Sequence, residues 1–161
     1  MLKQRALKTK IVTLGKLTAL LQKQKKKKVV FTNGVFDILH AGHVTYLERA
    51  KALGDILVVA LNSDESTTRL KGPTRPINPL KDRMTVMAAL ESIDYVISFS
   101  EDTPIKPISK ILPDVLVKGG DYDPKKIVGY AEVTGNGGKV KVIRFLEGRS
   151  TTAIATKIRK T

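Results

Sequence analysis

Apolar residues along the chain fall into short blocks, and each block has the length of one strand or one helix. Five segments have the continuous or alternating apolar pattern of strands: 29–32, 56–61, 95–99, 115–117 and 139–145. Apolar residues at helical spacing occur around these segments, at about 14–25, 44–53, 80–90, 105–112 and from 151 onward. The pattern over 127–133 also permits a helix, whereas 63–76 is polar, contains two prolines and is expected to be a loop.

The order of these segments determines the expected fold. Strands alternate with helices, which predicts an α/β architecture: a Rossmann-like open parallel sheet of about five strands, with helices on both faces. We expect one domain over 1–161, with a basic helical segment at 1–28 and the core at 29–161. Ligands bind such sheets beyond the carboxyl ends of the strands, so the loops there should carry the function.

Composition narrows the classes of function. The net charge is +14, but residues 1–28 hold ten Lys or Arg and no acid, whereas 29–161 holds nineteen basic and fifteen acidic residues. We interpret the excess as a solvated basic helix, with nucleic acid or an anionic surface as the alternative partner. Aromatic residues are only 5% of the chain and none interrupts the lysine run 25–28, so a surface for stacking single-stranded bases is not indicated.

The sequence shows no pattern of an export signal, a membrane span or a disulfide. Lys16 interrupts the apolar part of the N-terminal segment and lysines follow it, so no export signal is predicted. The longest apolar runs have the length of strands, so no membrane span is expected. The chain has no cysteine, which excludes disulfides and thiolate zinc sites. We expect a cytoplasmic protein.

The segment after the first strand combines several features of a phosphate-binding site. Asn33 and Gly34 allow backbone to approach a ligand closely. His40 and His43 are the two histidines of the chain and stand three positions apart at the start of a helix, so their rings can face one point. Gly42 removes a side chain between them. The helix N-terminus adds unpaired N–H groups and a positive partial charge, which suits phosphate.

Other roles are available to these residues. Capping or core packing would be the expected role of a single histidine, but two histidines in one such loop favour function. Two histidines at i and i+3 without an evident third ligand are a weak zinc signal. Asp37 could hold Mg²⁺ through oxygen, although an aspartate in a turn is also a common local cap.

Two familiar nucleotide motifs are missing. The sequence contains no G-x-x-x-x-G-K-[ST], and the glycine-rich segment 135–139 is only superficially similar to it. No G-x-G-x-x-G follows a strand. There is also no cysteine nucleophile and no serine in a G-x-S-x-G turn. A P-loop hydrolase and a classical NAD enzyme are therefore not expected.

Residues 31–43 resemble the H-x-G-H signature of the cytidylyltransferase-like nucleotidyltransferase superfamily. Further segments look like those of the D-glycero-D-manno-heptose 1-phosphate adenylyltransferases: 62–64, 69–72, 75–76, 79–80, 83–84, 101–104, 113–122, 127–129 and 148–152. The resemblance covers nearly the whole chain from about residue 11, and the blocks 118–122 and 150–152 are the most specific to the heptose branch. Relatives commonly carry cysteine at the position of Val35, where a small apolar residue should be neutral for the chemistry.

The resemblance implies transfer of AMP from ATP to heptose 1-phosphate, which gives ADP-heptose and pyrophosphate for a bacterial surface glycan such as the lipopolysaccharide core. The sugar phosphate attacks the α-phosphorus in line, and no general base is needed because the nucleophile is already an anion. Alignment and positive charge are then the main requirements. His40 and His43 are the expected catalytic donors, and Mg²⁺ is expected to bridge phosphate oxygens.

The resemblance also implies partners and further site residues. Many relatives are fused to a sugar kinase, for which 161 residues leave no room, so a stand-alone enzyme with a separate upstream heptose kinase is expected, and a homodimer with it. Residues expected at the nucleotide are Thr32, Asn33, Gly34, Phe36, Gly42, Lys118, Gly119, Asp121, Ser150, Thr151 and Thr152. Residues expected at the sugar phosphate are Asp37, Asn62, Asp64, Lys71, Arg75 and Arg83.

Structural alternatives and other functions stay open at this point. Lys71 and Arg75 could be solvated loop charges, and Ser150 could be an ordinary N-cap. Another H-x-G-H enzyme, such as a glycerol-3-phosphate or ethanolamine-phosphate cytidylyltransferase, would share the two histidines but would not explain the block 118–122. A nucleic-acid-binding module would bind with steep salt dependence and lose that binding when residues 1–28 are deleted.

Overall fold

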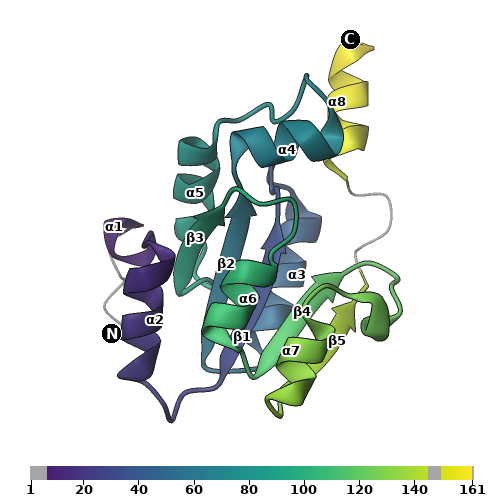
Figure 1. The fold of residues 1–161 in the computed structure, drawn as a ribbon. Coiled ribbons are helices and arrows are strands. Elements are labelled where there is room, and N and C mark those ends of the chain that lie inside the picture. The colour runs from purple at the N-terminus through teal and green to yellow at the C-terminus, as the bar shows by residue number, and fades with distance from the viewer. Residues whose placement is uncertain (1–6, 145–149, 161) are drawn as a thin grey trace.

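The computed structural model describes residues 7–144 and 150–160, and its centre is one parallel sheet (Figure 1). The strands are β1 (Val29–Gly34), β2 (Ile56–Asn62), β3 (Tyr95–Phe99), β4 (Val115–Gly119) and β5 (Lys139–Ile143). They lie in the order β3-β2-β1-β4-β5, and every neighbouring pair is parallel. The expected Rossmann-like parallel sheet is confirmed.

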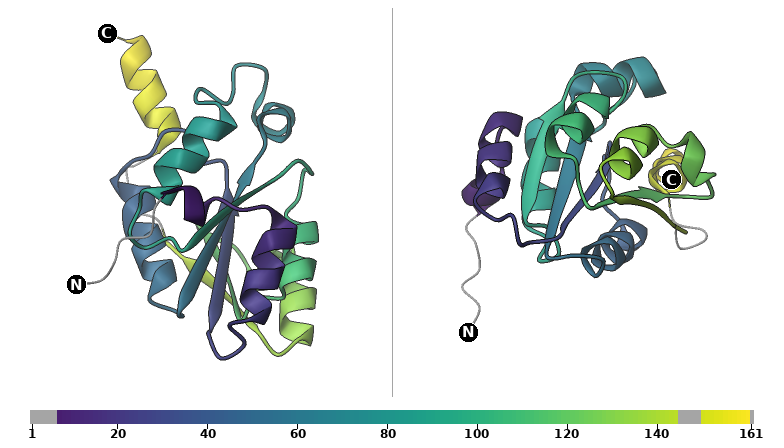
Figure 2. Two further views of the ribbon diagram at one scale, coloured as in Figure 1. Left: turned by 90° about the vertical axis from the view of Figure 1, so that its left-hand side faces the viewer. Right: turned by 60° about the horizontal axis from the view of Figure 1, so that its bottom comes forward.

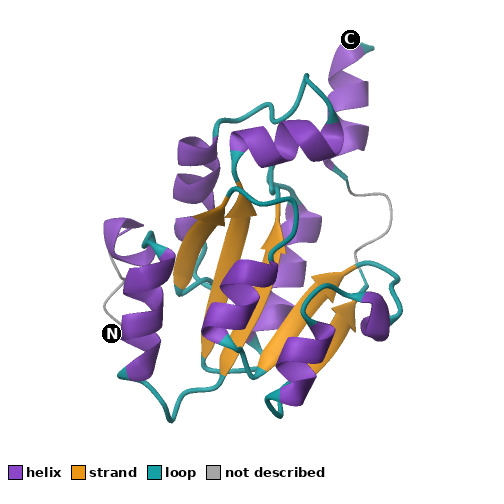
Figure 3. Cartoon of the chain, viewed as in Figure 1, coloured by secondary structure: helices purple, strands orange, loops and turns teal. Residues whose placement is uncertain are grey.

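Helices cover both faces of this sheet, as expected (Figure 3). One face carries α3 (Ala41–Lys51) and α5 (Leu80–Ala88), and the other carries α2 (Leu14–Gln22), α6 (Ile105–Ile111) and α7 (Tyr130–Gly135). The remaining helices are α1 (Leu7–Lys10), α4 (Asp64–Lys71), the 3₁₀-helix η1 (Pro124–Lys126) and α8 (Thr151–Arg159). Within the two described ranges, no helix combines the length and apolar character needed to cross a membrane.

Alternation along the strands produces two separate cores, one under each layer of helices. In β2, which is buried over its whole length, Val59 packs into the core that contains Met87 of α5. Its neighbour Val58 points to the opposite face and packs into the core that contains Leu17 of α2 and Ile108 of α6. A strand with apolar neighbours on both faces needs apolar residues at every position, which explains the continuous runs in the sequence.

At the amino ends of β1 and β2, aspartate side chains accept hydrogen bonds from backbone N–H groups. Asp114 accepts the backbone N–H of Val29 at 2.7 Å, and Asp94 accepts that of Leu57 at 2.8 Å. The N–H groups of Val29, the first residue of β1, and of Leu57, the second residue of β2, therefore have partners at this edge of the sheet.

The carboxyl edge is built differently, because the chain changes direction across the sheet there. From β1 the chain moves to β2 and β3 on one side, then crosses to β4 and β5 on the other. The loops that follow β1 and β4 therefore diverge, and such a switch point is where open α/β sheets bind ligands. Both α4 and α8 lie at this edge, and α8 projects away from the sheet (Figure 2).

The segment 63–76 differs from the expected loop, since residues 64–71 form α4. Its stability comes from its ends: the Ser63 side chain accepts the N–H of Ser66, the first turn is acidic and the last turn is basic. A polar helix of this kind has too few apolar positions for periodicity to indicate it. Elsewhere α2 ends at Gln22 rather than near 25, and the end of the segment 139–145 lies outside the described residues.

The packing of α7 against the sheet generates a stability prediction. A Cβ at Gly129 would lie 2.7 Å from Ile108 and 3.3 Å from Leu116, and Gly129 has a φ of +93°. We expect Gly129→Ala to lower the free energy of unfolding by about 3 kcal/mol, through the left-handed backbone and overpacking together. Urea unfolding followed by circular dichroism measures this change.

The matched control lies in the same helix. A Cβ at Gly135 meets no atom within 4 Å, and its φ is not in the left-handed region. Gly135→Ala should leave stability unchanged or raise it by about 0.5 kcal/mol through helix propensity. Equal effects of the two substitutions would contradict the packing described for Gly129.

Candidate active site

The loop from β1 to α3 brings the two histidines together. His40 has extended backbone at the N-terminal cap of α3, and the His40 and His43 rings stack with centroids 3.8 Å apart and planes 24° apart. Phe36 presents its ring edge-on to His43, with centroids 5.1 Å apart. Phe36 also has a φ of 48°, so strained backbone is held at this turn.

Burial and the neighbouring ring determine the charge of His43. Burial, followed by the proximity of His40, lowers the pKa of His43 to about 4. The imidazole is therefore neutral at neutral pH and carries one N–H donor. Among the residues that the structure describes, the buried Nδ1 of His43 has no hydrogen-bond partner. An anion beside this ring would favour its protonated form and raise its pKa.

Two adjoining cavities open at the carboxyl edge of the sheet. The histidine cavity has a volume of about 340 Å³ and is lined by both histidines, by residues of the loop after β1 and by the first residues of α8. The strand-end cavity has a volume of about 430 Å³ and lies over the ends of β2 and β3 and beside η1. Six residues line both cavities: Asn33, Gly34, Val35, Lys71, Lys118 and Tyr122.

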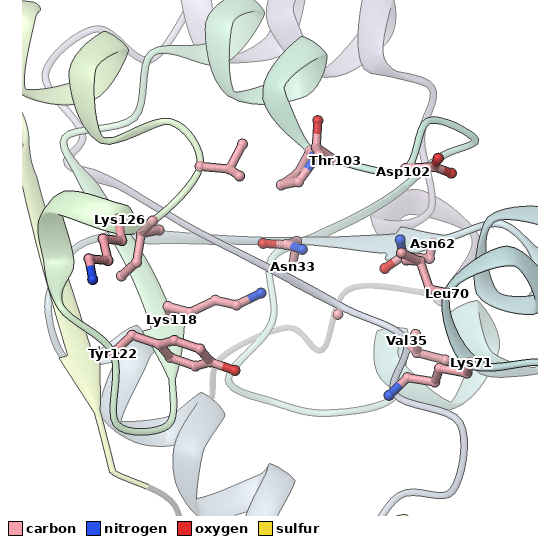
Figure 4. Close-up of a pocket in the computed structure, with 14 residues that line it drawn as sticks. Asn33, Val35, Asn62, Leu70, Lys71, Asp102, Thr103, Lys118, Tyr122 and Lys126 are labelled. Carbon is pink, nitrogen blue, oxygen red and sulfur yellow. The ribbon is translucent and has the colours of Figure 1, made fainter.

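The wall that the two cavities share is cationic. Lys118 leaves β4 and Lys71 closes the last turn of α4, and both ammonium groups point into the open space in Figure 4. Burial and then the charge of Lys71 lower the pKa of Lys118. Neither lysine forms a salt bridge within the described part of the chain. Two neighbouring cations that have no salt bridge produce a positive potential, which favours an anionic ligand.

The N-terminus of α8 forms the opposite wall of the histidine cavity. Ser150 caps this helix, with its Oγ accepting the N–H of Ala153 at 3.0 Å. Thr151 donates through its Oγ1 to the carbonyl of Ile38 at 3.2 Å, which ties α8 to the loop after β1. Because Thr152 also lines the cavity, hydroxyl groups and a helix N-terminus face the histidines there.

Asp37 lines the histidine cavity, and its carboxylate is engaged with protein partners. Its carboxylate accepts the Arg75 Nε–H at 2.7 Å and the N–H groups of Ile77 and Asn78 at 2.8 Å. Burial raises the pKa of Asp37, but the hydrogen bonds from Asn78, Ile77 and Arg75 outweigh it and hold the pKa below its ordinary value. With both oxygens engaged, Asp37 positions Arg75 at the histidine cavity.

Arg83 lies elsewhere than expected. Its side chain is fully buried and lines neither cavity. It donates to the carbonyls of Val35 at 2.7 Å, Asn62 at 2.9 Å and Asn78 at 3.0 Å, and to the carboxylate of Asp64 at 2.7 Å. The geometry does not support contact of Arg83 or Asp64 with the sugar phosphate, because both groups are engaged with protein partners.

The other expected residues divide into two groups. Those that line a cavity are Asn33, Gly34, Phe36, Asn62, Lys71, Arg75, Lys118, Gly119, Ser150, Thr151 and Thr152. Those that line neither cavity are Thr32, Gly42 and Asp121. Thr32 bonds the Tyr46 hydroxyl at 2.6 Å and supports the site from below, whereas Asp121 is exposed.

Several lining residues were missed by the sequence reading. In the strand-end cavity they are Leu70, Asp102, Thr103, Pro104, Tyr122, Lys126, Ile127 and Val128. The signal for Asp102 and Thr103 was their place just after a predicted strand, where side chains reach the carboxyl edge of the sheet. Residues 126–128 lie at the end of η1 and just after it. The hydrophobic periodicity of the sequence does not predict which way the side chains of such a segment point.

The donor set argues against a resident metal. Within the described ranges, no group of three or more His, Cys, Asp or Glu side chains could hold an ion. Asp37, the candidate from sequence, has its oxygens occupied by Arg75, Ile77 and Asn78. A cation in this site would therefore enter with phosphate oxygens and water as its main ligands.

The Asp37 contacts predict a loss of stability on substitution. Asp37→Asn leaves the half-buried Arg75 guanidinium without its charge partner and turns a buried amide toward two N–H donors, so the free energy of unfolding should fall by about 3 kcal/mol. Because the pKa of Asp37 is lowered by folding, this contribution is present above its ordinary pKa and is lost as the pH falls through the lowered value.

Denaturant titrations at several pH values test this prediction. The control is Glu101→Gln, which removes an exposed ion pair with Lys106 and should unfold at the same denaturant concentration as the wild type. A stability gap between wild type and Asp37→Asn that stays constant into acid would contradict the assignment.

The lowered pKa of His43 predicts proton uptake when a polyphosphate binds. Near pH 6 the free protein holds His43 neutral, and a bound anion should protonate it. Calorimetric titration of magnesium pyrophosphate in two buffers of different ionisation enthalpy measures the protons taken up. The His43→Gln variant, titrated with the same ligand, should take up fewer protons. Protons taken up by the ligand itself are the same in both titrations and cancel in the difference. Equal uptake by both proteins would exclude His43 as the acceptor.

Comparisons with known proteins identify several proteins that are similar to this chain. Two bacterial proteins named bifunctional protein HldE, from Sodalis glossinidius and Klebsiella pneumoniae, are each 62% identical over 138 residues. These matches cover 86% of this chain and 29% of each relative, so the chain spans less than a third of their length.

One solved structure is covered over nearly its whole length, and a family model matches most of this chain. The lipopolysaccharide core biosynthesis protein from Thermoplasma volcanium is 32% identical, with a TM-score of 0.62, and the match covers 76% of this chain and 99% of that protein. The model of the cytidylyltransferase-like family matches residues 31–159, which include both histidines and the N-terminus of α8. The chain belongs to the cytidylyltransferase-like family.

Proposed function

We propose that this chain is a nucleotidyltransferase that transfers AMP from ATP to a heptose 1-phosphate and releases pyrophosphate. The observation that carries the proposal is the meeting of two cavities at a cationic wall, with stacked histidines and a helix N-terminus in one of them. The lipopolysaccharide core protein similar to this chain and the resemblance of the block 118–122 support the choice of heptose.

The histidine cavity suits the nucleotide triphosphate. His40, His43 and Arg75 face the start of α8 across it, so donors and positive potential surround the space. The neutral His43 becomes a cation when negative charge arrives, which makes its contribution larger for a polyphosphate than for a neutral ligand. Gly119 extends this cavity along the end of β4, where the nucleoside would lie.

The strand-end cavity suits the acceptor sugar. Asn62, Asp102, Thr103 and Lys126 provide polar groups around it, as the hydroxyl groups of a sugar require. Apolar side chains such as Val128 complete the wall and can pack against the C–H faces of a sugar ring. Among its described lining residues this cavity has no histidine and it includes the carboxylate of Asp102, so it is less suited to a triphosphate.

Catalysis follows from the position of the shared wall. Lys71 and Lys118 would hold the acceptor phosphate so that one of its oxygens attacks the α-phosphorus and the pyrophosphate leaves on the opposite side. The new P–O bond replaces the bond to pyrophosphate, and no proton has to move because the attacking oxygen is already ionised. His40 and His43 would stabilise the charge that develops on the departing phosphates.

Several consequences follow for the setting of the reaction. Mg²⁺ would arrive bound to ATP, since the protein offers few ligands of its own. The acceptor is the product of a phosphoryl transfer to a sugar, so a sugar kinase acts before this step. We infer a cytoplasmic reaction, where ATP is available, and we retain the homodimer as an expectation. Because the two cavities use elements from β1 to α8, we also propose that the chain acts as one domain.

Pyrophosphate release tests the proposed function. The purified protein should release pyrophosphate with Mg·ATP and D-glycero-D-manno-heptose 1-phosphate, and His43→Ala should lose about 100- to 1,000-fold in kcat while keeping the wild-type circular dichroism spectrum. Lys106→Met is the control, because it removes a positive charge from an exposed face of α6 that lies outside both cavities. Its kcat should match that of the wild type.

A substrate panel distinguishes the alternatives. Turnover with CTP and glycerol 3-phosphate, but not with ATP and the heptose, would replace this function with that of another member of the family. A His43→Ala variant with wild-type kcat would refute the role of the histidine. Binding of DNA that disappears when residues 1–28 are deleted, without any pyrophosphate release, would favour a nucleic-acid-binding protein.

A further inference from the structure

Tyr122 is an aromatic side chain that stands between the two cavities. It lines both the histidine cavity and the strand-end cavity. Its ring belongs to neither hydrophobic core, and the residue is 56% exposed. In Figure 4 its hydroxyl points into the space that the Lys118 side chain also enters. Tyr122 therefore offers an open aromatic surface at the place where the two substrates would meet.

The backbone before Tyr122 is shaped to hold the ring there. Gly120 has a φ of +128°, and a Cβ at this position would lie 2.6 Å from the Tyr122 ring. Only glycine accepts both the conformation and the close approach. The Gly120 N–H also donates to the carbonyl of Ile143 at 3.0 Å, which fixes the turn to β5. The main chain before Tyr122 is thus held in place and leaves room for the ring, which lies outside both hydrophobic cores.

The neighbouring residue shows the opposite arrangement. Asp121 is exposed and lines neither cavity, although its carboxylate was the side chain expected from the sequence to meet the nucleotide. Within the segment 118–122, the side chains that reach the cavities are those of Lys118 and Tyr122. Tyr122 is therefore the aromatic side chain of this block that can contact the substrates.

We propose that Tyr122 is a substrate-positioning residue that separates the acceptor from the nucleotide. Its ring packs against the acceptor sugar and keeps the sugar phosphate beside Lys118, in line with the α-phosphorus. Packing a sugar ring on the exposed aromatic face removes apolar surface of both partners from water. This inference rests on the proposed function, because it takes the nucleotide and the sugar to occupy the two cavities assigned to them.

The role of the ring follows from what its loss would do. Without it the two cavities merge on this side, and the acceptor can turn or shift. Displacement of reacting groups by about 1 Å is enough to cost about 100-fold in rate, so a partition acts on kcat more than on nucleotide binding. Tyr122 also lines the histidine cavity, but the contacts proposed for the triphosphate come from the histidines and α8, so they should persist without the ring.

Steady-state kinetics of three variants tests this inference. We expect Tyr122→Ala to lower kcat with heptose 1-phosphate by about 30-fold, with the KM for ATP changed by less than about 3-fold. Tyr122→Phe keeps the ring and should retain kcat within about 3-fold, because the partition depends on the ring. Lys125→Ala, an exposed neighbour that lines neither cavity, is the control and should match the wild type.

Calorimetric affinity for Mg·ATP, measured in the absence of acceptor, separates binding from positioning. Wild-type affinity in Tyr122→Ala, together with the fall in kcat, supports the inference. An active wild type with an equally active Tyr122→Ala overturns the partition alone. A Tyr122→Phe variant as slow as Tyr122→Ala also overturns it, because the hydroxyl would then carry the effect. A wild type that does not turn over this acceptor refutes the proposed function and this inference together.

Discussion

The buried guanidinium of Arg83 is the interaction on which the site depends. It donates to the carbonyls of Val35, Asn62 and Asn78, so it joins the loop after β1, the end of β2 and the segment before α5. Its ion pair with Asp64 balances the charge inside the protein. The hydrogen bonds from Arg83 to these three carbonyls hold the segments at fixed distances from each other. Removing Asp64 would leave the buried charge of Arg83 without compensation.

Asp37 extends the same constraint toward the substrates. It holds Arg75 and the N–H groups of Ile77 and Asn78, next to the carbonyl that Arg83 already holds. The two side chains together place the histidine loop against the segment that carries Arg75 and follows Lys71. Arg75, one of the cations proposed to face the phosphates, is thereby positioned by its contact with buried Asp37, which would reduce the entropy lost on binding.

The charges of the site suit an anionic ligand. Lys71 and Lys118 oppose each other, and His43 stays neutral because it is buried beside His40. Each of these arrangements is unfavourable for positive charge until negative charge arrives. In the proposed function, a bound polyphosphate would relieve the repulsion between the lysines and allow His43 to take up a proton. Under the proposed function, the affinity for phosphate would therefore come from these lysines and from His43.

The sequence predicted the parallel sheet well, because strands buried on both faces, such as β2, must be apolar at every position. It also located His40 and His43, since both stand in one loop after a strand. It missed α4, whose stability comes from caps and charges. Arg83 and Asp121 show a further limit. A charged side chain at the start of a helix or after a strand can turn inward or outward, and only tertiary contacts decide which.

The central claim is that the histidines stabilise charge while the acceptor phosphate attacks the α-phosphorus directly. Stereochemistry at that phosphorus tests this most directly, with a single diastereomer of ATP that carries sulfur on the α-phosphate. One in-line displacement inverts the configuration in the sugar nucleotide product. The account predicts inversion, measured by ³¹P NMR of the product. Retention would contradict it, because two displacements would then be required, with a side chain such as His43 as a covalent nucleophile.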